Sequence, residues 1–364
     1  MPEIYLEYEL IWNSHQRNQE LMATLVHAPN DHPKTATGKV GVLLINLGTP
    51  DGYDNKNMRR YLREFLSDKR VIEWSRWFWY PILYGIVLNT RPKKSGAAYK
   101  TIWNQEKNES PLRTFTRSQA DKLAIALKDH PKIVVEWEMR FGNPSIAEKI
   151  ATLKQAGCER ILIFPLYPQY SASTTATVND KAFEVLSSMR WMPAVRTVYA
   201  YHDEPVYIKA LATSIRDHLA TLDFEPEKII ASYHGIPQSY FKKGDPYHCH
   251  CLKTTRLLRE ELGWDEDRLI TCFQSRFGPE EWLQPYTDDT ISQLANQGIE
   301  NIAVLNPGFV SDCLETLEEI AVEGAQTFIQ AGGKNFAHIP CLNDTREGMR
   351  VIEEITAREL GGWL

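Results

Sequence analysis

The sequence has no apolar run long enough to cross a bilayer and no excess of basic residues. Its longest apolar stretch, residues 74–88, falls short of the roughly 20 residues that a spanning helix needs, and it contains Arg76 and Pro81. The 41 Lys and Arg residues are outnumbered by 47 Asp and Glu residues. Because phosphate binding needs a concentrated basic surface, no nucleic-acid partner is expected. No secretion signal is evident near the N-terminus, so we expect a cytoplasmic protein.

The motifs of several large enzyme classes are also missing. The phosphate loop GxxxxGK[ST] and the dinucleotide-binding turn GxGxxG do not occur. The serine-hydrolase elbow GxSxG and the zinc-protease motif HExxH do not occur either. P-loop enzymes, Rossmann dehydrogenases, GxSxG hydrolases and HExxH proteases are therefore not expected.

Cysteine is sparse, and a disulfide scaffold is excluded for a chain of 364 residues. The six expected thiols are Cys158, Cys249, Cys251, Cys272, Cys313 and Cys341. Cys249 and Cys251 alternate with two histidines, and with Cys272 they could hold zinc or an iron–sulfur cluster. The usual CxxC pairs are absent, which favours a surface helix start instead. Cys313 is expected to line a pocket.

Eight short apolar runs alternate with longer amphipathic stretches from residue 39 onward. They cover residues 40–48, 132–139, 160–167, 195–201, 228–235, 268–273, 301–308 and 335–342. Continuous apolar runs indicate strands that are buried on both faces, as in parallel sheets covered by helices. The sequence therefore predicts an α/β protein with two facing domains of four strands each.

The predicted domain boundary lies after residue 175. Residues 1–38 are expected to be an irregular lead-in, 39–175 the first domain and 176–343 the second. Residues 344–360 are expected to form a helix, which can pack back on the first domain. Ligands of open α/β sheets bind at the carboxyl ends of the strands, so the residues that follow each run are the candidates for function.

Two of these strand ends carry acid–base groups. His234 follows the fifth run in SYHGIP and is the best candidate for a base, unless it is only a hydrogen-bonded structural residue. After the seventh run, Glu315, Glu319 and Glu323 share one face of a predicted helix, with Asp312 near the same line. Such a row suits Fe²⁺, Mn²⁺ or Mg²⁺. A solvated acidic face is the alternative.

Residues 74–88 contain three tryptophans and two tyrosines and precede Arg91, Lys93 and Lys94. This composition is typical of a segment at a membrane surface or at the lip of an apolar pocket. A buried core helix explains it equally well.

Six motifs, in this order, resemble those of the ferrochelatase family. They are LINLGTPD, FPLYPQYSASTT, SYHGIP, FKKGDPY, FQSRFGPEEWLQPYTD and SDCLETLEEI, within Val40 to Leu342. The resemblance implies two Rossmann-like domains with an active-site cleft between them. It implies an enzyme that inserts Fe²⁺ into protoporphyrin IX with release of two protons, the terminal step of haem biosynthesis. Fe²⁺ is then a substrate, and no cofactor is required.

The resemblance also implies roles for individual residues. His234 and Glu315 match the catalytic and metal-binding pair, and Asp312, Glu319 and Glu323 a metal or proton path. The implied porphyrin contacts are Arg91, Tyr99, Ser110, Arg140, Tyr170 and Trp282. Residues 74–88 look like the lip of the porphyrin cleft, with peripheral membrane contact. Whether His234 or Glu315 takes the protons or binds the metal stays open.

Two departures from the animal members of the family matter. Ala172 stands where they have a cluster cysteine, so an animal-type [2Fe–2S] cluster is not expected. Cys313 stands where they have a histidine. Alternative functions are a chelatase for coproporphyrin or for a cobalt-accepting precursor, and a non-catalytic tetrapyrrole or metal carrier.

Overall fold

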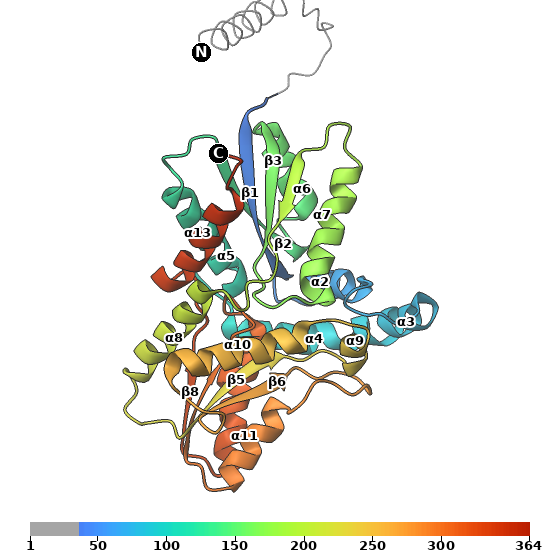
Figure 1. Ribbon diagram of the computed structural model, residues 1–364. Coiled ribbons are helices and arrows are strands. Elements are labelled where there is room, and N and C mark those ends of the chain that lie inside the picture. Colours follow the sequence, from blue (N-terminus) through green and yellow to red (C-terminus); the bar gives the residue numbers. More distant parts are fainter. Residues whose placement is uncertain (1–35) are drawn as a thin grey trace, which may run out of the picture. The chain divides into compact units, whose positions relative to one another are not determined.

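The computed structural model describes residues 36–364 (Figure 1), so nearly all of the predicted lead-in lies outside the described residues. Two parallel four-stranded sheets form the scaffold, with strand orders β2-β1-β3-β4 and β6-β5-β7-β8. The first contains β1 (Lys39–Thr49), β2 (Ile133–Gly142), β3 (Cys158–Pro165) and β4 (Ala194–Thr197). The second contains β5 (Lys228–His234), β6 (Leu269–Gln274), β7 (Asn301–Leu305) and β8 (Asn335–Ile339). The predicted fold class is confirmed.

Helices surround both sheets. Those before β4 are α2 (Asn55–Ser67), α3 (Arg76–Ile82), α4 (Leu88–Ile102), α5 (Pro111–Ala126), α6 (Ile146–Gln155) and α7 (Thr177–Ser187). Those after it are α8 (Pro205–Leu219), α9 (Gln238–Lys242), α10 (Tyr247–Leu262), α11 (Thr287–Asn296), α12 (Ala325–Gln330) and α13 (Arg346–Glu359). Three π-helical segments adjoin them: η1 (Leu83–Val87), η2 (Ala172–Ala176) and η3 (Glu315–Gly324).

The central strand β1 shows why the apolar runs are continuous. Val42 and Leu44 pack into a core with residues of α5 and α8, whereas Leu43 and Ile45 pack into a second core with residues of α6 and α7. Successive side chains of a strand point to opposite faces, so a sheet covered on both faces needs apolar residues at every position.

The fourth strand lies outside the domain to which the sequence analysis assigned it. The predicted boundary after residue 175 put the run 195–201 in the second domain, but β4 pairs with β3 from Arg160–Ala194 to Ile163–Thr197. The reason is that α7 packs on the first sheet, where Val178 and Ala182 join the core of β1 and β3. The chain changes sheets between β4 and β5. Residues 37–364 form one compact unit that holds both sheets.

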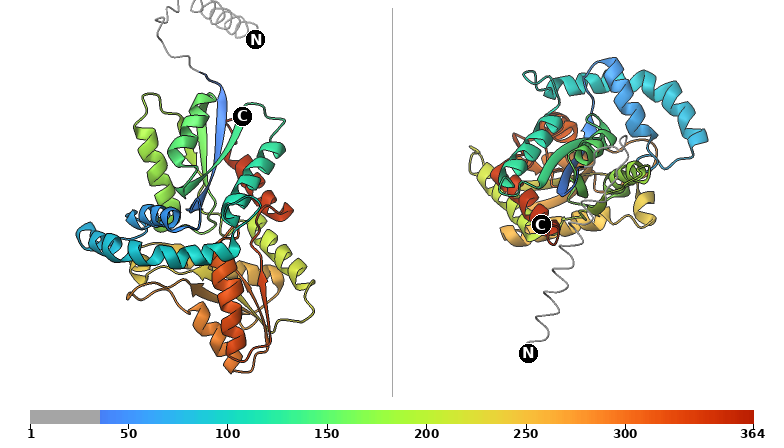
Figure 2. Two further views of the ribbon diagram at one scale, coloured as in Figure 1. Left: turned by 180° about the vertical axis from the view of Figure 1, so that it is seen from behind. Right: turned by 90° about the horizontal axis from the view of Figure 1, so that it is seen from above.

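The predicted C-terminal helix occurs as α13, which packs against α5 and α8 (Figure 2). The residues after it are tied to the first sheet. Arg160 donates to the carbonyl oxygen of Trp363 at 2.8 Å, and Arg196 donates to that of Gly361 at 2.9 Å.

Between β1 and β2 the chain makes an excursion through α2, α3, η1 and α4, which forms an arm beside the ends of the strands (Figures 1 and 2). Within residues 36–364, no helix has the length and apolar character needed to traverse a bilayer.

Candidate active site

A cavity with a volume of about 810 Å³ opens where the strands of both sheets end. Residues 46–49 at the end of β1 and His234 at the end of β5 line it, together with α2, α4 and the start of η3. Ligand sites of open α/β sheets are expected at this edge. The volume lies within the usual range for small-molecule sites, about 300–1,000 Å³.

His234 is presented to the cavity by the last position of β5. Its Nδ1 lies 2.6 Å from the carbonyl oxygen of Gly235. A carbonyl oxygen can only accept a hydrogen bond, so Nδ1 carries a proton. The ring of Trp282 lies 6.3 Å away between centroids and also lines the cavity. Nε2 is therefore the ring nitrogen of His234 that is left to act as a base.

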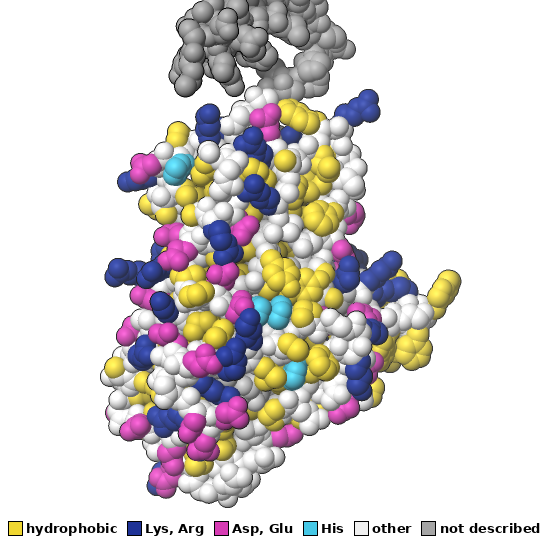
Figure 3. All heavy atoms as spheres, in the orientation of Figure 1, with side chains coloured by type: hydrophobic (Ala, Val, Ile, Leu, Met, Phe, Trp, Pro, Cys, Tyr) yellow, Lys and Arg dark blue, Asp and Glu magenta, His cyan; other side chains and the backbone are white. Residues whose placement is uncertain are grey.

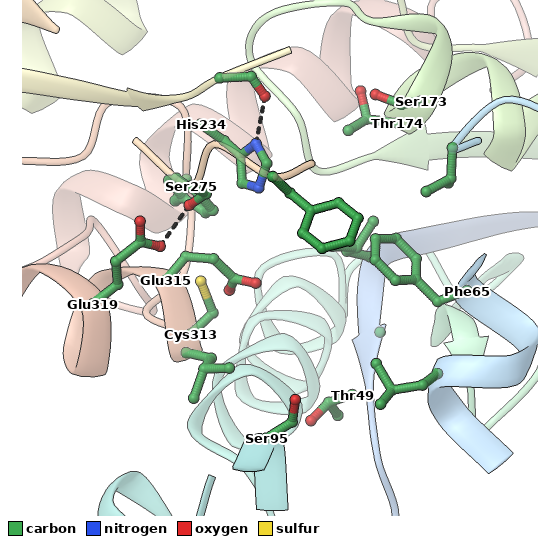
Figure 4. Close-up of a pocket in the computed structure, with 18 of the residues that line it drawn as sticks. Thr49, Phe65, Ser95, Ser173, Thr174, His234, Ser275, Cys313, Glu315 and Glu319 are labelled. Carbon is green, nitrogen blue, oxygen red and sulfur yellow. Dashed lines mark hydrogen bonds between the residues drawn. The ribbon is translucent and has the colours of Figure 1, made fainter. Parts of the chain in front are cut away.

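Three of the predicted acids line the same cavity as His234. Glu315, Glu319 and Glu323 project from η3, and Figure 4 shows Glu315 and Glu319 on the side of the cavity where His234 lies. Burial raises the pKa of Glu319, against the effect of a hydrogen bond from Ser275. The structure therefore brings the predicted base and the predicted acids to one site.

A fourth acid was missed. Glu318 lines the cavity, and burial together with Glu323 raises its pKa. A repeat of 3.6 residues does not align these two residues, but η3 is π-helical, and i→i+5 bonding brings residues five apart close together. Knowledge of the π-helical winding would have identified Glu318.

Asp312 was predicted on the metal or proton path, but the structure does not place it on the wall of the cavity formed by residues 36–364. Its carboxylate is buried and does not line the cavity formed by the described residues. It accepts hydrogen bonds from Thr316 at 2.9 Å, from Asn343 at 2.6 Å and from the backbone of Cys341. These bonds hold the loop before η3 against the segment after β8, so Asp312 is structural.

Four of the six predicted porphyrin contacts line the cavity. They are Arg91, Tyr99, Ser110 and Trp282. The Arg91 guanidinium lies 4.2 Å from the ring centroid of Phe277, and burial lowers its pKa. Burial also raises the pKa of Tyr99, which keeps its hydroxyl protonated. Ser110 caps α5 by accepting from the backbone of Arg113 at 3.3 Å.

The other two, Arg140 and Tyr170, do not line the cavity formed by residues 36–364. Arg140 forms an ion pair with Asp68 and donates to Thr177. The backbone of Tyr170 donates to His250 at 3.2 Å, and its ring stacks on Tyr199.

Several lining side chains were not predicted as site residues. They include Thr49, Phe65, Ser95, Ser173, Thr174 and Ser275, on both sides of the cavity in Figure 4. Ser173 and Thr174 lie in FPLYPQYSASTT and Ser275 in FQSRFGPEEWLQPYTD, so the motifs were the available signal. Cys313 lines the cavity as expected.

The cysteine-rich stretch forms the first turn of α10, with Cys249 exposed and Cys251 buried. All six cysteines are free thiols. In the described part of the chain, no group of three or more His, Cys, Asp or Glu side chains is arranged to bind a metal.

Residues 74–88 have apolar side chains on both a buried and an exposed side. Trp79, Leu83 and Val87 are buried in a core with α2, whereas Trp77 is 94% and Phe78 62% exposed. Apolar side chains gather at the end of the arm that carries α3 (Figure 3). The segment is therefore a packed helix with an exposed apolar face.

The sequence model of the Ferrochelatase family matches residues 39–360. The chain belongs to the ferrochelatase family. Ferrochelatase of Agrobacterium fabrum is 67% identical over 344 residues, which cover 94% of this chain and 100% of that protein. Ferrochelatase of Rhizobium meliloti is 68% identical over 337 residues, 93% of this chain and 99% of that protein.

A solved structure supports the fold. SirB from Bacillus subtilis with Fe³⁺ matches with a TM-score of 0.52 and 13% identity, over 89% of this chain and 98% of that chain. Membership in the ferrochelatase family makes the chain an enzyme of haem biosynthesis that inserts iron into protoporphyrin. The predicted enzyme class is confirmed. The alternative function, a non-catalytic carrier, is not supported.

Proposed function

We propose that iron insertion takes place beside His234 and Glu315, with the porphyrin held in the cavity of about 810 Å³. The observation that carries this proposal is that the basic nitrogen of His234 and the acids of η3 line one cavity. Fe²⁺ replaces two pyrrole N–H protons, so the site has to accept two protons for each metal ion that it delivers.

His234 accepts the two pyrrole protons in turn at Nε2 and passes each to the acids of η3. The neighbouring carboxylates stabilise the imidazolium that forms each time. Glu315 binds Fe²⁺, for which carboxylate oxygen is a suitable ligand. The metal moves inward and the protons move outward along Glu318, Glu319 and Glu323. These acids follow Glu315 on η3, and the last of them, Glu323, is exposed. A group raised in pKa by burial, such as Glu319, can hold a proton during this transfer.

The rest of the cavity binds the macrocycle. Phe65, Leu62 and Trp282 offer apolar surface to a flat ligand, and Arg91 and Lys94 offer positive charge to its propionates. Contacts remote from the reacting nitrogens can supply the roughly 1–5 kcal/mol stored when a bound substrate is distorted. Bending the macrocycle exposes its nitrogen lone pairs to the metal.

The protein requires no cofactor in this proposal, and Fe²⁺ is a substrate. We place the enzyme in the cytoplasm, in peripheral contact with the inner face of the membrane. The exposed apolar face of residues 74–88, followed by Arg91, Lys93 and Lys94, supports that contact.

Anaerobic insertion of Fe²⁺, or of Zn²⁺, into protoporphyrin by the purified full chain tests the assignment. We expect His234→Ala to lower kcat by about 10²–10⁴-fold, the usual contribution of a positioned base. Glu315→Gln should raise the metal KM and lower kcat. Wild-type turnover in either variant would contradict the role assigned to that residue, and a preference for coproporphyrin over protoporphyrin would correct the substrate.

A further inference from the structure

We propose that Gln274 is a positioning residue for metal delivery: its side-chain amide holds the backbone of Glu315 and the carboxylate of Glu319 in register with His234. This inference rests on the proposed function, because it concerns how the acids of η3 are held. Gln274 is buried at the end of β6, and its register partner on β5 is His234 itself.

The amide of Gln274 makes four hydrogen bonds. Nε2 donates to the carbonyl oxygen of Glu315 at 2.8 Å and to Oε2 of Glu319 at 3.3 Å. Oε1 accepts from Ser232 at 2.7 Å and from Asn306 at 2.7 Å. A flipped amide would place its oxygen against the carbonyl oxygen of Glu315 and its nitrogen against the Asn306 amide nitrogen, which donates to the carbonyl oxygen of Ser232. The surroundings therefore favour one orientation.

The backbone of Gln274 reaches the base as well. Its carbonyl oxygen accepts from the N–H of Gly235 at 2.8 Å, and the carbonyl oxygen of Gly235 is the acceptor that fixes the His234 ring. One residue therefore connects the base to the acids on the other element. A change in the Gln274 amide should disturb the acids first, since the backbone bond to Gly235 does not depend on the side chain.

The bonds behind Gln274 all run in one direction. Asn306 donates through Nδ2 to Gln274 and to the carbonyl oxygen of Ser232, so its Oδ1 is left to accept from Nε2 of His338 at 3.2 Å. The donors thus point from His338 through Asn306 and Gln274 to Glu319. Hydrogen bonds aligned head to tail polarise one another, which strengthens the last bond, the one to the Glu319 carboxylate.

Gln274→Met tests the role, because methionine has nearly the same length and no amide. We expect the metal KM to rise about 10–100-fold, the usual effect of losing a residue that orients a metal ligand, with the porphyrin KM unchanged. Thr287→Val is the matched control. Its hydroxyl is buried in the same network, 2.8 Å from that of Ser232, but is not a hydrogen-bond partner of the Gln274 amide. We expect it to lower the unfolding temperature and leave both KM values unchanged.

If Gln274→Met does not fold, Gln274→Glu replaces it. One carboxylate oxygen still accepts from Ser232 and Asn306, and the other presents an acceptor where Nε2 was a donor. We expect the same selective rise in the metal KM. An unchanged metal KM in the folded variant, with Glu315→Gln impaired, would overturn the positioning role and leave the proposed function standing. Full activity in Glu315→Gln would instead contradict the proposed function.

Discussion

The Arg140 guanidinium and the Asp68 carboxylate form an ion pair whose side chains are only 9% and 11% exposed. Removing one member of a buried pair leaves the other charge unpaired and costs about 3–5 kcal/mol. We therefore predict that Arg140→Met lowers the free energy of unfolding by this amount in denaturant titrations. The porphyrin KM should stay near that of the parent, because Arg140 does not line the cavity formed by the described residues.

The double variant Asp68→Leu with Arg140→Met is the control. Since neither charge is then left alone, we expect it to be more stable than Arg140→Met. A large rise in porphyrin KM in folded Arg140→Met would show that the side chain contacts the substrate after all.

Glu138 on β2 is the opposite case, a buried carboxyl group with no hydrogen-bond partner in residues 36–364 for either oxygen. Burial raises its pKa well above the usual value of 4.5. A raised pKa in the folded state means that the protonated form is the stable one, so Glu138 lowers stability progressively as the pH rises above 4.5. We predict that Glu138→Met raises the free energy of unfolding by about 1–3 kcal/mol at neutral pH.

Urea unfolding of Glu138→Met and the parent between pH 4 and pH 8 is the measurement. The difference should be largest at the high end and shrink toward pH 4.5. Glu136→Met is the control, since Glu136 pairs with Lys149 at 2.7 Å, and it should not stabilise. If the gain in the free energy of unfolding does not vary with pH, the effect comes from packing and not from the charge of Glu138.

Individual site residues were predictable where their position on a strand or helix is enough to place them in the site. His234 ends a strand, and Glu315 and Glu319 share a helix face, so both follow from local pattern. The positions of Arg140 and Asp312 away from the cavity wall could not be predicted, because each side chain has a partner that is distant in the sequence. Asp68 lies 72 residues from Arg140, and Asn343 lies 31 residues from Asp312.

At the scale of elements, the α3–η1 segment has to satisfy two environments at once. Its buried face holds Trp79 in the core, and its exposed face presents Trp77 and Phe78. Burying a large apolar side chain is worth about 1.5–3 kcal/mol. We predict that Trp77→Ser with Phe78→Ser weakens binding to anionic lipid vesicles at least about tenfold in a sedimentation assay, with the unfolding temperature unchanged.

Trp79→Ser serves as the contrasting variant, because it removes a core side chain and should lower stability while the exposed face stays intact. Equal vesicle binding by the double variant and the parent, or no vesicle binding by the parent, would contradict the membrane contact.

At the scale of the molecule, sequence patterns located all eight strands but not their distribution between the sheets. The fourth run lies between the third and the fifth in the sequence, and β4 pairs with β3 in the sheet on which α7 packs. The location of the cavity was predictable, because ligand sites lie where the carboxyl ends of the strands meet. The arm formed by α2, α3, η1 and α4 could not be predicted from the sequence. Apolar side chains on both faces of a helix are compatible with burial and with exposure.

Helix α13 follows all eight strands of the two sheets in the sequence, so it is synthesised after them. Yet Met349, Val351, Ile352 and Ile355 of this helix belong to the same core as Val42 and Leu44 of the first strand. During synthesis, one face of the first sheet therefore stays incompletely covered until the helix emerges. The second sheet receives all four of its strands before the first sheet is sealed, so we expect the half of the enzyme that is made first to finish folding last.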